Sequence, residues 1–195
     1  MNIKAIIFDC FGVLSTEGFQ VFCGKYFKDA PQKRKLAQQM MDQFSLGAAT
    51  YEEFVSQLSL LSGASQHIVR EYLSENKPNE LLFNYIRQEL KPTYKIGMLS
   101  NTGADWLSQL FSAQDLELFD DIVLSFKVGM TKPNPAIYVL AASRLEVDPK
   151  ECILVDDIAR YCEGAKVVGM LAILYEDFFQ TKDKLDYLLK TTPNN

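Results

Sequence analysis

Aspartate residues stand directly after two of the short apolar runs in this sequence. Asp9 follows the run at residues 3–8, and Asp156 and Asp157 follow the run at residues 153–155. A carboxylate can act as a nucleophile, and grouped carboxylates bind hard divalent cations through their oxygen atoms. Three carboxylates in one place repel one another, and a cation such as Mg²⁺ relieves that repulsion. We therefore expect a Mg²⁺ site that includes a nucleophile, Asp9.

Two further polar groups stand at the ends of other apolar runs. Ser100 and Asn101 follow residues 96–99, and Lys132 follows the run at residues 122–124. A lysine and a hydroxyl are suited to hold phosphoryl oxygens while negative charge redistributes during transfer. Together with Asp9, these groups predict hydrolysis of a phosphate ester through an aspartyl-phosphate.

The elements that must position these residues form an alternating pattern. Short apolar runs at residues 3–8, 96–99, 122–124, 153–155 and 171–174 have the length and β-branched character of buried strands. Helix-like segments at residues 104–111 and 135–145 separate the later runs, which predicts a parallel α/β sheet of Rossmann-like type. Ligands bind beyond the carboxyl ends of such strands, so one edge of the sheet collects the polar residues.

The segment at residues 15–92 has a different pattern. Strand signals nearly vanish, and Leu36, Met40, Phe44 and Leu58 are spaced as on helices. We therefore expect a core made of residues 1–14 and 93–195, with a helical insertion at residues 15–92.

Four motifs in this order resemble those of haloacid dehalogenase-like hydrolases that have a helical cap. They are Phe8-Asp9-Cys10-Phe11-Gly12-Val13-Leu14, Leu99-Ser100-Asn101, Gly129-Met130-Thr131-Lys132-Pro133 and Val155-Asp156-Asp157. The resemblance spans nearly the whole chain, and the helical insertion falls where that superfamily places its cap. It implies that the cap selects substrates.

The same resemblance implies a role for each site residue. Asp9 is the expected nucleophile and a metal ligand, and Ser100 and Lys132 are the expected phosphate contacts, with Asn101 beside them. The expected metal ligands are Asp9, Asp156, Asp157 and the backbone carbonyl of Phe11.

Phe11 is the main departure from the pattern of this superfamily. Its phosphatases usually carry a second aspartate at this position as general acid and base, which is worth roughly a hundred- to ten-thousand-fold in rate. Two alternatives therefore stay open: a metal-independent haloacid dehalogenase that uses Asp9, or a weakened phosphate- or partner-binding protein. The acidic pair at Asp156 and Asp157 favours phosphate chemistry. Tyr161 is a smaller departure, because relatives often have asparagine there.

Composition limits the partners of the chain. Its 195 residues carry a formal net charge of -5 and no basic stripe, so nucleic acid is not an expected partner. No apolar run approaches the roughly 20 residues that cross a bilayer, and the four cysteines lack the spacing of a disulfide scaffold. We expect a cytoplasmic monomer or homodimer that acts with Mg²⁺ on a small phosphorylated metabolite.

Overall fold

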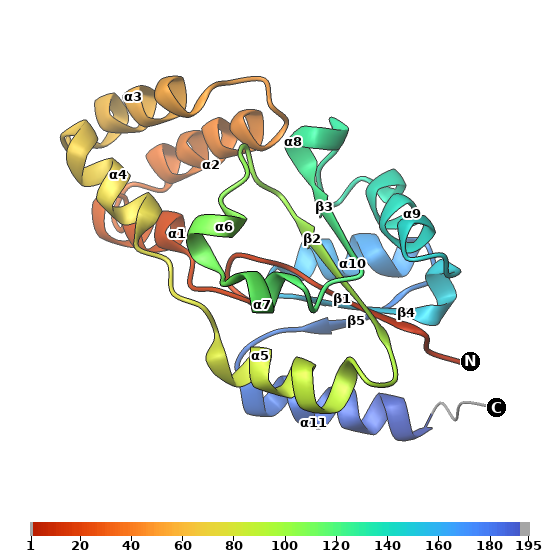
Figure 1. The fold of residues 1–195 in the computed structure, drawn as a ribbon. Helices are drawn as coiled ribbons and strands as arrows, with labels where there is room; N and C mark the ends of the chain where they lie inside the picture. The colour runs from red at the N-terminus through yellow and green to blue at the C-terminus, as the bar shows by residue number, and fades with distance from the viewer. Residues whose placement is uncertain (1, 192–195) are drawn as a thin grey trace.

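The structure is a computed structural model that describes residues 2–191. Its centre is a sheet of parallel strands in the order β3-β2-β1-β4-β5, with helices on both faces (Figure 1). The strands are β1 (Ala5–Phe8), β2 (Lys95–Ser100), β3 (Asp121–Leu124), β4 (Cys152–Asp156) and β5 (Leu171–Leu174). Each lies close to a predicted run, so the α/β fold with a Rossmann-like parallel sheet is confirmed.

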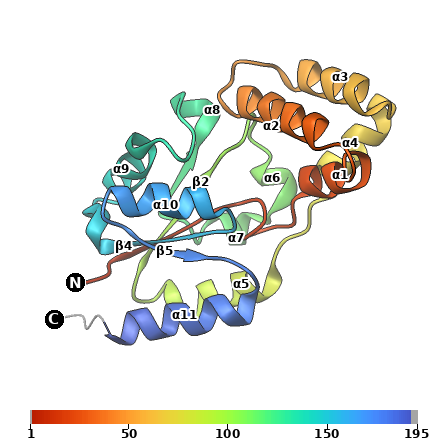
Figure 2. The same ribbon diagram turned by 180° about the vertical axis from the view of Figure 1, so that it is seen from behind.

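Both faces of the sheet are buried, which explains why its strands are continuous apolar runs. Ile6 and Phe8 pack in one apolar cluster with Leu82 and Leu185, while Ile7 packs in a second cluster on the opposite face. The first face is covered by α5 (Glu80–Tyr85), a π-helix (Ile86–Leu90) and α11 (Phe178–Thr191), and the second by α9 (Pro135–Arg144) and α10 (Ala159–Val167) (Figures 1 and 2).

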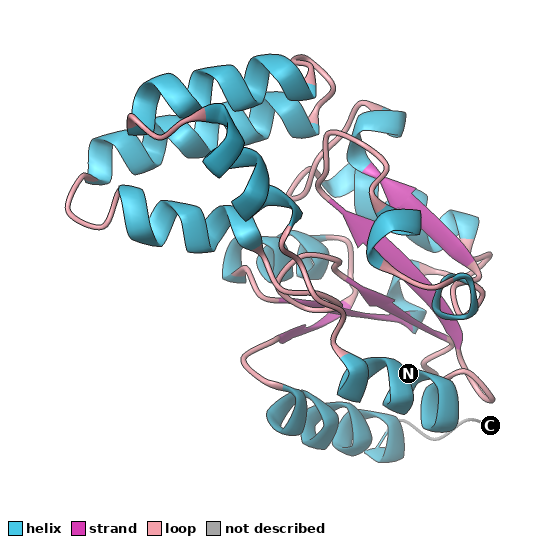
Figure 3. Cartoon of the chain, turned by 60° about the vertical axis from the view of Figure 1, so that its left-hand side comes forward, coloured by secondary structure: helices cyan, strands magenta, loops and turns pink. Residues whose placement is uncertain are grey.

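Four helices form a separate layer with an apolar cluster of its own (Figure 3). They are α1 (Gly18–Tyr26), α2 (Pro31–Ser45), α3 (Tyr51–Ser62) and α4 (Gln66–Ser74). Phe22, Phe54 and Leu58 lie at the centre of this cluster and are almost fully buried. Thr50 and Glu53 begin α3 with a reciprocal capping box. We call these four helices the cap.

The two connections between the cap and the sheet run side by side. Ser15 pairs with Pro78 in an antiparallel bridge, and the amide of Thr16 donates to the carbonyl of Lys77 at 3.0 Å. The predicted division, with the insertion at residues 15–92, stays a prediction. Because α5 and the π-helix pack on the sheet, the packing favours a cap that ends before Glu80.

The helix expected at residues 104–111 is mostly absent. Only α6 (Leu107–Leu110) forms there, because local side chains hold the preceding backbone in a turn. The Thr102 hydroxyl donates to the Ala104 carbonyl at 2.9 Å, and Asp105 Oδ1 accepts from the amide of Leu107. The other short helices are α7 (Ala113–Leu116), α8 (Ser125–Val128) and a 3-10 turn (Pro149–Glu151). Within residues 2–191, no helix has the length and apolar character to span a bilayer.

Candidate active site

The register of the sheet brings the predicted acidic residues together. Phe8 pairs with Met98 of β2 on one side and with Val155 of β4 on the other, so the three strands end at the same level. Asp9 and Asp156 therefore meet at the carboxyl edge of the sheet. Each of Asp9, Asp156 and Asp157 offers an oxygen atom within 4.8 Å of those of the other two.

Lys132 lies between two of these carboxylates. Its Nζ atom is 2.8 Å from Asp9 Oδ1 and 2.6 Å from Asp156 Oδ2, and its side chain is completely buried. Burial alone would lower the pKa of Lys132, but the two carboxylates outweigh that effect and hold the pKa above its usual value. Lys132 is therefore a permanent cation that fixes Asp9 and Asp156 in place.

The carboxyl group of Asp9 has one bound and one available oxygen. Oδ1 accepts from the amide of Cys10 at 2.7 Å and from Lys132, whereas Oδ2 accepts no hydrogen bond within residues 2–191. Burial raises the pKa of Asp9 to about 7, against the opposing effect of Lys132 and with a further contribution from Asp156. A cation placed beside this carboxyl would favour its ionised, nucleophilic form.

Asp157 carries an unsatisfied buried oxygen. Among the described residues, Asp157 Oδ1 has no hydrogen-bond partner, whereas Asp156 accepts from both Lys132 and the amide of Ile158. Burial, followed by the charge of Asp156, raises the pKa of Asp157 to about 6. A buried oxygen without a donor costs about 1–3 kcal/mol, so this position favours a bound cation.

The loop after β1 makes room for Asp157. Gly12 has a φ of +90°, and a Cβ atom there would lie 2.4 Å from Asp157 Oδ2. The three carboxylates together carry more negative charge than Lys132 neutralises. Oxygen donors, excess negative charge and an unpartnered buried oxygen fit a hard divalent cation such as Mg²⁺. Phe11, whose carbonyl is a predicted ligand, lies in the same loop.

Ser100 is a buried residue at the end of β2, whereas Asn101 holds the loop that carries Lys132. Ser100, the last residue of β2, is 1% exposed, and its hydroxyl has no hydrogen-bond partner within the described chain. The side chain of Asn101 binds the backbone of Lys132 twice, by accepting from its amide at 2.8 Å and donating to its carbonyl at 3.0 Å. Asn101 thus positions the loop that carries the buried lysine.

Tyr161 lies beside the buried lysine and its loop. Its ring lies 5.1 Å from Lys132 Nζ, and its hydroxyl accepts from Asn101 Nδ2 at 3.2 Å. The carbonyl of Tyr161 accepts from the hydroxyl of Tyr138 at 2.9 Å. Tyr161 therefore supports the lysine and its loop from the side of α10.

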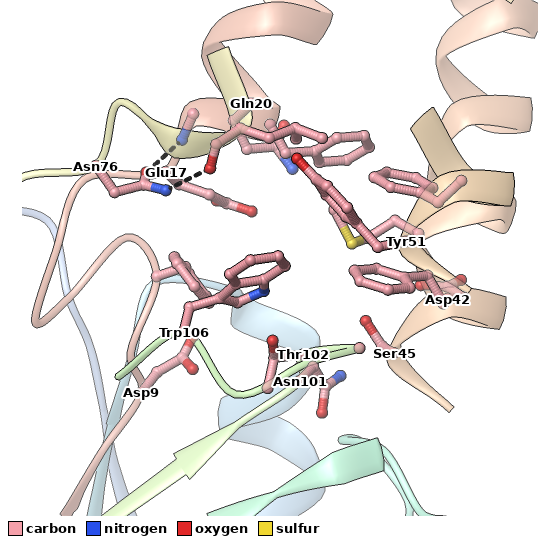
Figure 4. Close-up of a pocket in the computed structure, with 18 of the residues that line it drawn as sticks. Asp9, Glu17, Gln20, Asp42, Ser45, Tyr51, Asn76, Asn101, Thr102 and Trp106 are labelled. Atoms are coloured by element: carbon pink, nitrogen blue, oxygen red, sulfur yellow. Dashed lines mark hydrogen bonds between the residues drawn. The ribbon is translucent and has the colours of Figure 1, made fainter. Parts of the chain in front are cut away.

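A cavity of about 180 Å³ lies between the sheet edge and the cap, with Asp9 in its wall (Figure 4). Phe11 and Asn101 also line it, but the sequence did not identify Glu17, Tyr51 and Trp106 as parts of its walls. Apolar residues at helical spacing predict a helix face, but not whether that face meets another helix or a cavity. Burial, followed by the charges of Asp157 and Asp9, raises the pKa of Glu17 to about 8.

Comparison with known proteins gives the class to which this fold and site belong. A family model for haloacid dehalogenase-like hydrolases matches residues 3–169. The chain belongs to the haloacid dehalogenase-like hydrolase family, as its four motifs indicated.

Individual relatives are more distant. The chain is 28% identical to phosphatase MT3486 of Mycobacterium tuberculosis, over 94% of this chain and 92% of that protein. It is also 28% identical to bifunctional epoxide hydrolase 2 of Sus scrofa, over 91% of this chain but only 37% of the relative's length. A HAD family enzyme of Bacteroides thetaiotaomicron, solved with magnesium and inorganic phosphate, shares the fold with a TM-score of 0.69. Its sequence is 24% identical, and the match covers 91% of this chain and 98% of that one.

Proposed function

We propose that this protein is a Mg²⁺-dependent phosphohydrolase that cleaves a small phosphorylated metabolite through an aspartyl-phosphate at Asp9. The observation that carries the proposal is the state of the Asp9 carboxyl group. One oxygen is fixed by Lys132 and the Cys10 amide, and the other is unbound in a residue that lines the cavity. The relative named as a phosphatase, which aligns over nearly its whole length, supports the same reaction.

The reaction would proceed in two displacements at phosphorus. Asp9 Oδ2 attacks the phosphorus atom, the bond from phosphorus to the ester oxygen breaks, and the alcohol part leaves with that electron pair. Water then attacks the phosphorus atom, the bond from phosphorus to Asp9 Oδ2 breaks, inorganic phosphate leaves, and Asp9 returns as a carboxylate. The proton that the attacking water loses goes to solvent, and the released alkoxide takes its proton from solvent, because Phe11 supplies no acid. Lys132 keeps the attacking carboxylate oriented throughout, and Ser100 supplies a hydroxyl at the same sheet edge.

Asp157 is the proposed metal ligand that the geometry supports best, because its buried Oδ1 has no hydrogen-bond partner among the described residues. Asp157, the carbonyl of Phe11 and Asp9 are the groups that we expect to hold Mg²⁺. Asp156 is the weaker candidate, because its two oxygens are occupied by Lys132 and Ile158. When bound, the ion would offset the negative charge of the carboxylates and of the phosphoryl group.

The side chain of Phe11 favours a second candidate function. An aromatic group cannot protonate a leaving alkoxide, whereas a halide leaves without a proton. A metal-independent dehalogenase that uses Asp9 therefore remains a candidate. The excess negative charge around Asp157 favours phosphate chemistry, since a dehalogenase would have no cation to offset it.

Hydrolysis of para-nitrophenyl phosphate tests the proposal, because this ester has a good leaving group and least needs a general acid. We expect turnover with Mg²⁺, none with a chelator, and none in Asp9→Asn, whose amide is nearly isosteric but a poor nucleophile. Asp183→Asn changes an exposed carboxylate on α11 and should keep full activity.

Two results would contradict the proposal. Full activity of a folded Asp9→Asn variant would exclude the nucleophile. Release of halide from 2-chloropropionate in the presence of chelator, without phosphate release from the ester, would establish the dehalogenase instead.

A further inference from the structure

Aromatic side chains from both the cap and the core line the cavity above Asp9, with polar side chains between them. We infer that the substrate is a phosphate monoester of an apolar alcohol or phenol, whose hydrocarbon part occupies this cavity while its single phosphate group meets Asp9. This inference rests on the proposed phosphohydrolase function and names its substrate class.

One aromatic pair lies within the cap, and a second joins the cap to the core beside the cavity. The rings of Phe44 and Phe54 stack with their centroids 5.1 Å apart and their planes 3° from parallel. Tyr51 of the cap meets Trp106 of the core edge to face, with centroids 5.0 Å apart (Figure 4). Aromatic walls of this kind gain free energy when they cover hydrocarbon.

Charge in the cavity argues against substrates with several phosphates. Among the described residues that line it there is no lysine, arginine or histidine, whereas Glu17 and Asp42 add carboxylates to Asp9. Arg70 lies against the ring of Tyr51, but its guanidinium is paired with Glu52. A second phosphate group would therefore find carboxyl groups and no free cationic side chain in these walls.

The size of the cavity limits the hydrocarbon part. An apolar cavity of roughly 150 Å³ is enough to hold benzene. The 180 Å³ found here therefore accommodates one aromatic ring or an alkyl chain of comparable size.

A matched pair of substrates tests the inference. n-Hexyl phosphate and glucose 6-phosphate are both monoesters of six-carbon primary alcohols with the same charge, and they differ in the hydroxyl groups and the sugar ring. We expect kcat/KM to be at least roughly tenfold higher for the hexyl ester, because several methylene groups leave water. Equal values, or a preference for the sugar phosphate, would overturn the inference.

Binding can be measured without turnover. n-Hexylphosphonate cannot be hydrolysed, and Trp106 is the only tryptophan of the chain, so its emission reports on the cavity directly. We expect the hexyl compound to bind at least roughly tenfold more tightly than methylphosphonate and to change the Trp106 emission. Equal affinities by calorimetry would contradict the inference whatever the catalytic result.

A variant in the cap tests whether the hydrocarbon part of the ligand occupies the cavity. Tyr51→Ala should weaken binding of n-hexylphosphonate roughly tenfold and leave methylphosphonate unchanged, because only the longer compound reaches the aromatic wall. Leu60→Ala, at an 83% exposed position of the same helix, is the matched control and should change neither affinity. An identical loss for both phosphonates in Tyr51→Ala would show that the ring does not contact the chain.

The failure of this inference and the failure of the proposed function can be told apart. Turnover of para-nitrophenyl phosphate without any preference for hexyl compounds would keep the phosphohydrolase and reject the substrate class. Tight, selective binding of n-hexylphosphonate without turnover of any phosphate ester would keep the apolar site and reject the hydrolase.

Discussion

At the scale of single residues, Lys132 decides how the buried charges of the site are balanced. Its ammonium group contacts Asp9 and Asp156, and no water-exposed surface remains on its side chain. Removing one partner from a buried ion pair leaves uncompensated charge, which is much more costly than the loss of an exposed pair. The lysine therefore has a structural role in addition to the proposed phosphate contact.

We expect Lys132→Met to lower the free energy of unfolding by about 3–5 kcal/mol, because it leaves Asp9 and Asp156 buried without their cation. Urea unfolding in the presence of chelator measures this. Lys127→Met removes an exposed pair with Asp105 and should cost no more than about 1 kcal/mol. If Lys132→Met lowers the free energy of unfolding by less than about 1 kcal/mol, the two carboxylates do not depend on this cation.

The sequence predicted candidate site residues at the ends of strands, and the structure places three of them, Asp9, Asp156 and Asp157, close together. Asp9, Asp156 and Asp157 lie together since parallel strands end at one edge, and that geometry is a property of the fold. The contacts of Asn101 and Tyr161 with the lysine and its loop could not be predicted, since they depend on the path of two loops in space. The roles of the site residues stay predictions until the variants are measured.

At the scale of elements, the loop after β1 sets the space available to the acidic pair. Gly12 adopts a left-handed conformation, and its missing side chain lets Asp157 approach the loop. The backbone of the same loop closes on itself, since the Gly12 amide donates to Ser15 at 2.8 Å and the Ser15 amide to Cys10 at 2.9 Å. A change at Gly12 therefore acts on the metal site through geometry.

We expect Gly12→Ala to weaken Mg²⁺ binding at least roughly tenfold, because the methyl group displaces the Asp157 carboxylate from its position. Magnesium titration by calorimetry measures the loss. Gly24→Ala is the control, because a Cβ atom there meets nothing within 4 Å. Unchanged Mg²⁺ affinity in a folded Gly12→Ala variant would place the ion elsewhere.

The sequence predicted the elements correctly where the burial of apolar side chains dominates. β1 and β4 are fully buried apolar runs, so hydrophobic pattern alone located them. The segment at residues 104–111 reads as a helix by its apolar spacing, yet side chains of Thr102 and Asp105 bind the backbone and shorten it to α6. Such local competition does not appear in periodicity.

At the scale of the whole molecule, burial of carboxyl groups links stability to pH. The pKa values of Asp9, Asp157 and Glu17 are raised to about 7, 6 and 8, whereas carboxyl groups in an unfolded chain titrate near about 4. Between these ranges the folded chain holds protons that the unfolded chain has released. The stability that these groups contribute is therefore complete below about pH 4 and is lost as the pH rises through 6–8.

We expect the Tm of the protein in chelator to fall by at least about 5 °C between about pH 5.5 and about pH 8.5. Mg²⁺ should restore part of the loss at the higher pH, because it binds the ionised carboxylates of the folded chain alone. Asp9→Asn removes one of the titrating groups and should flatten the profile. A Tm that rises over this range in chelator would show that the three carboxyl groups are ionised at little cost.

The paired connections at Ser15 and Pro78 have a consequence for how such proteins can change over evolutionary time. The chain leaves the sheet and returns to it at nearly the same point, with Thr16 and Lys77 hydrogen-bonded to each other. Insertions or deletions between Thr16 and Lys77 change the cap without shifting the register of β1 against its neighbours. The cap and the core that carries the proposed catalytic residues are thus free to diversify at separate rates.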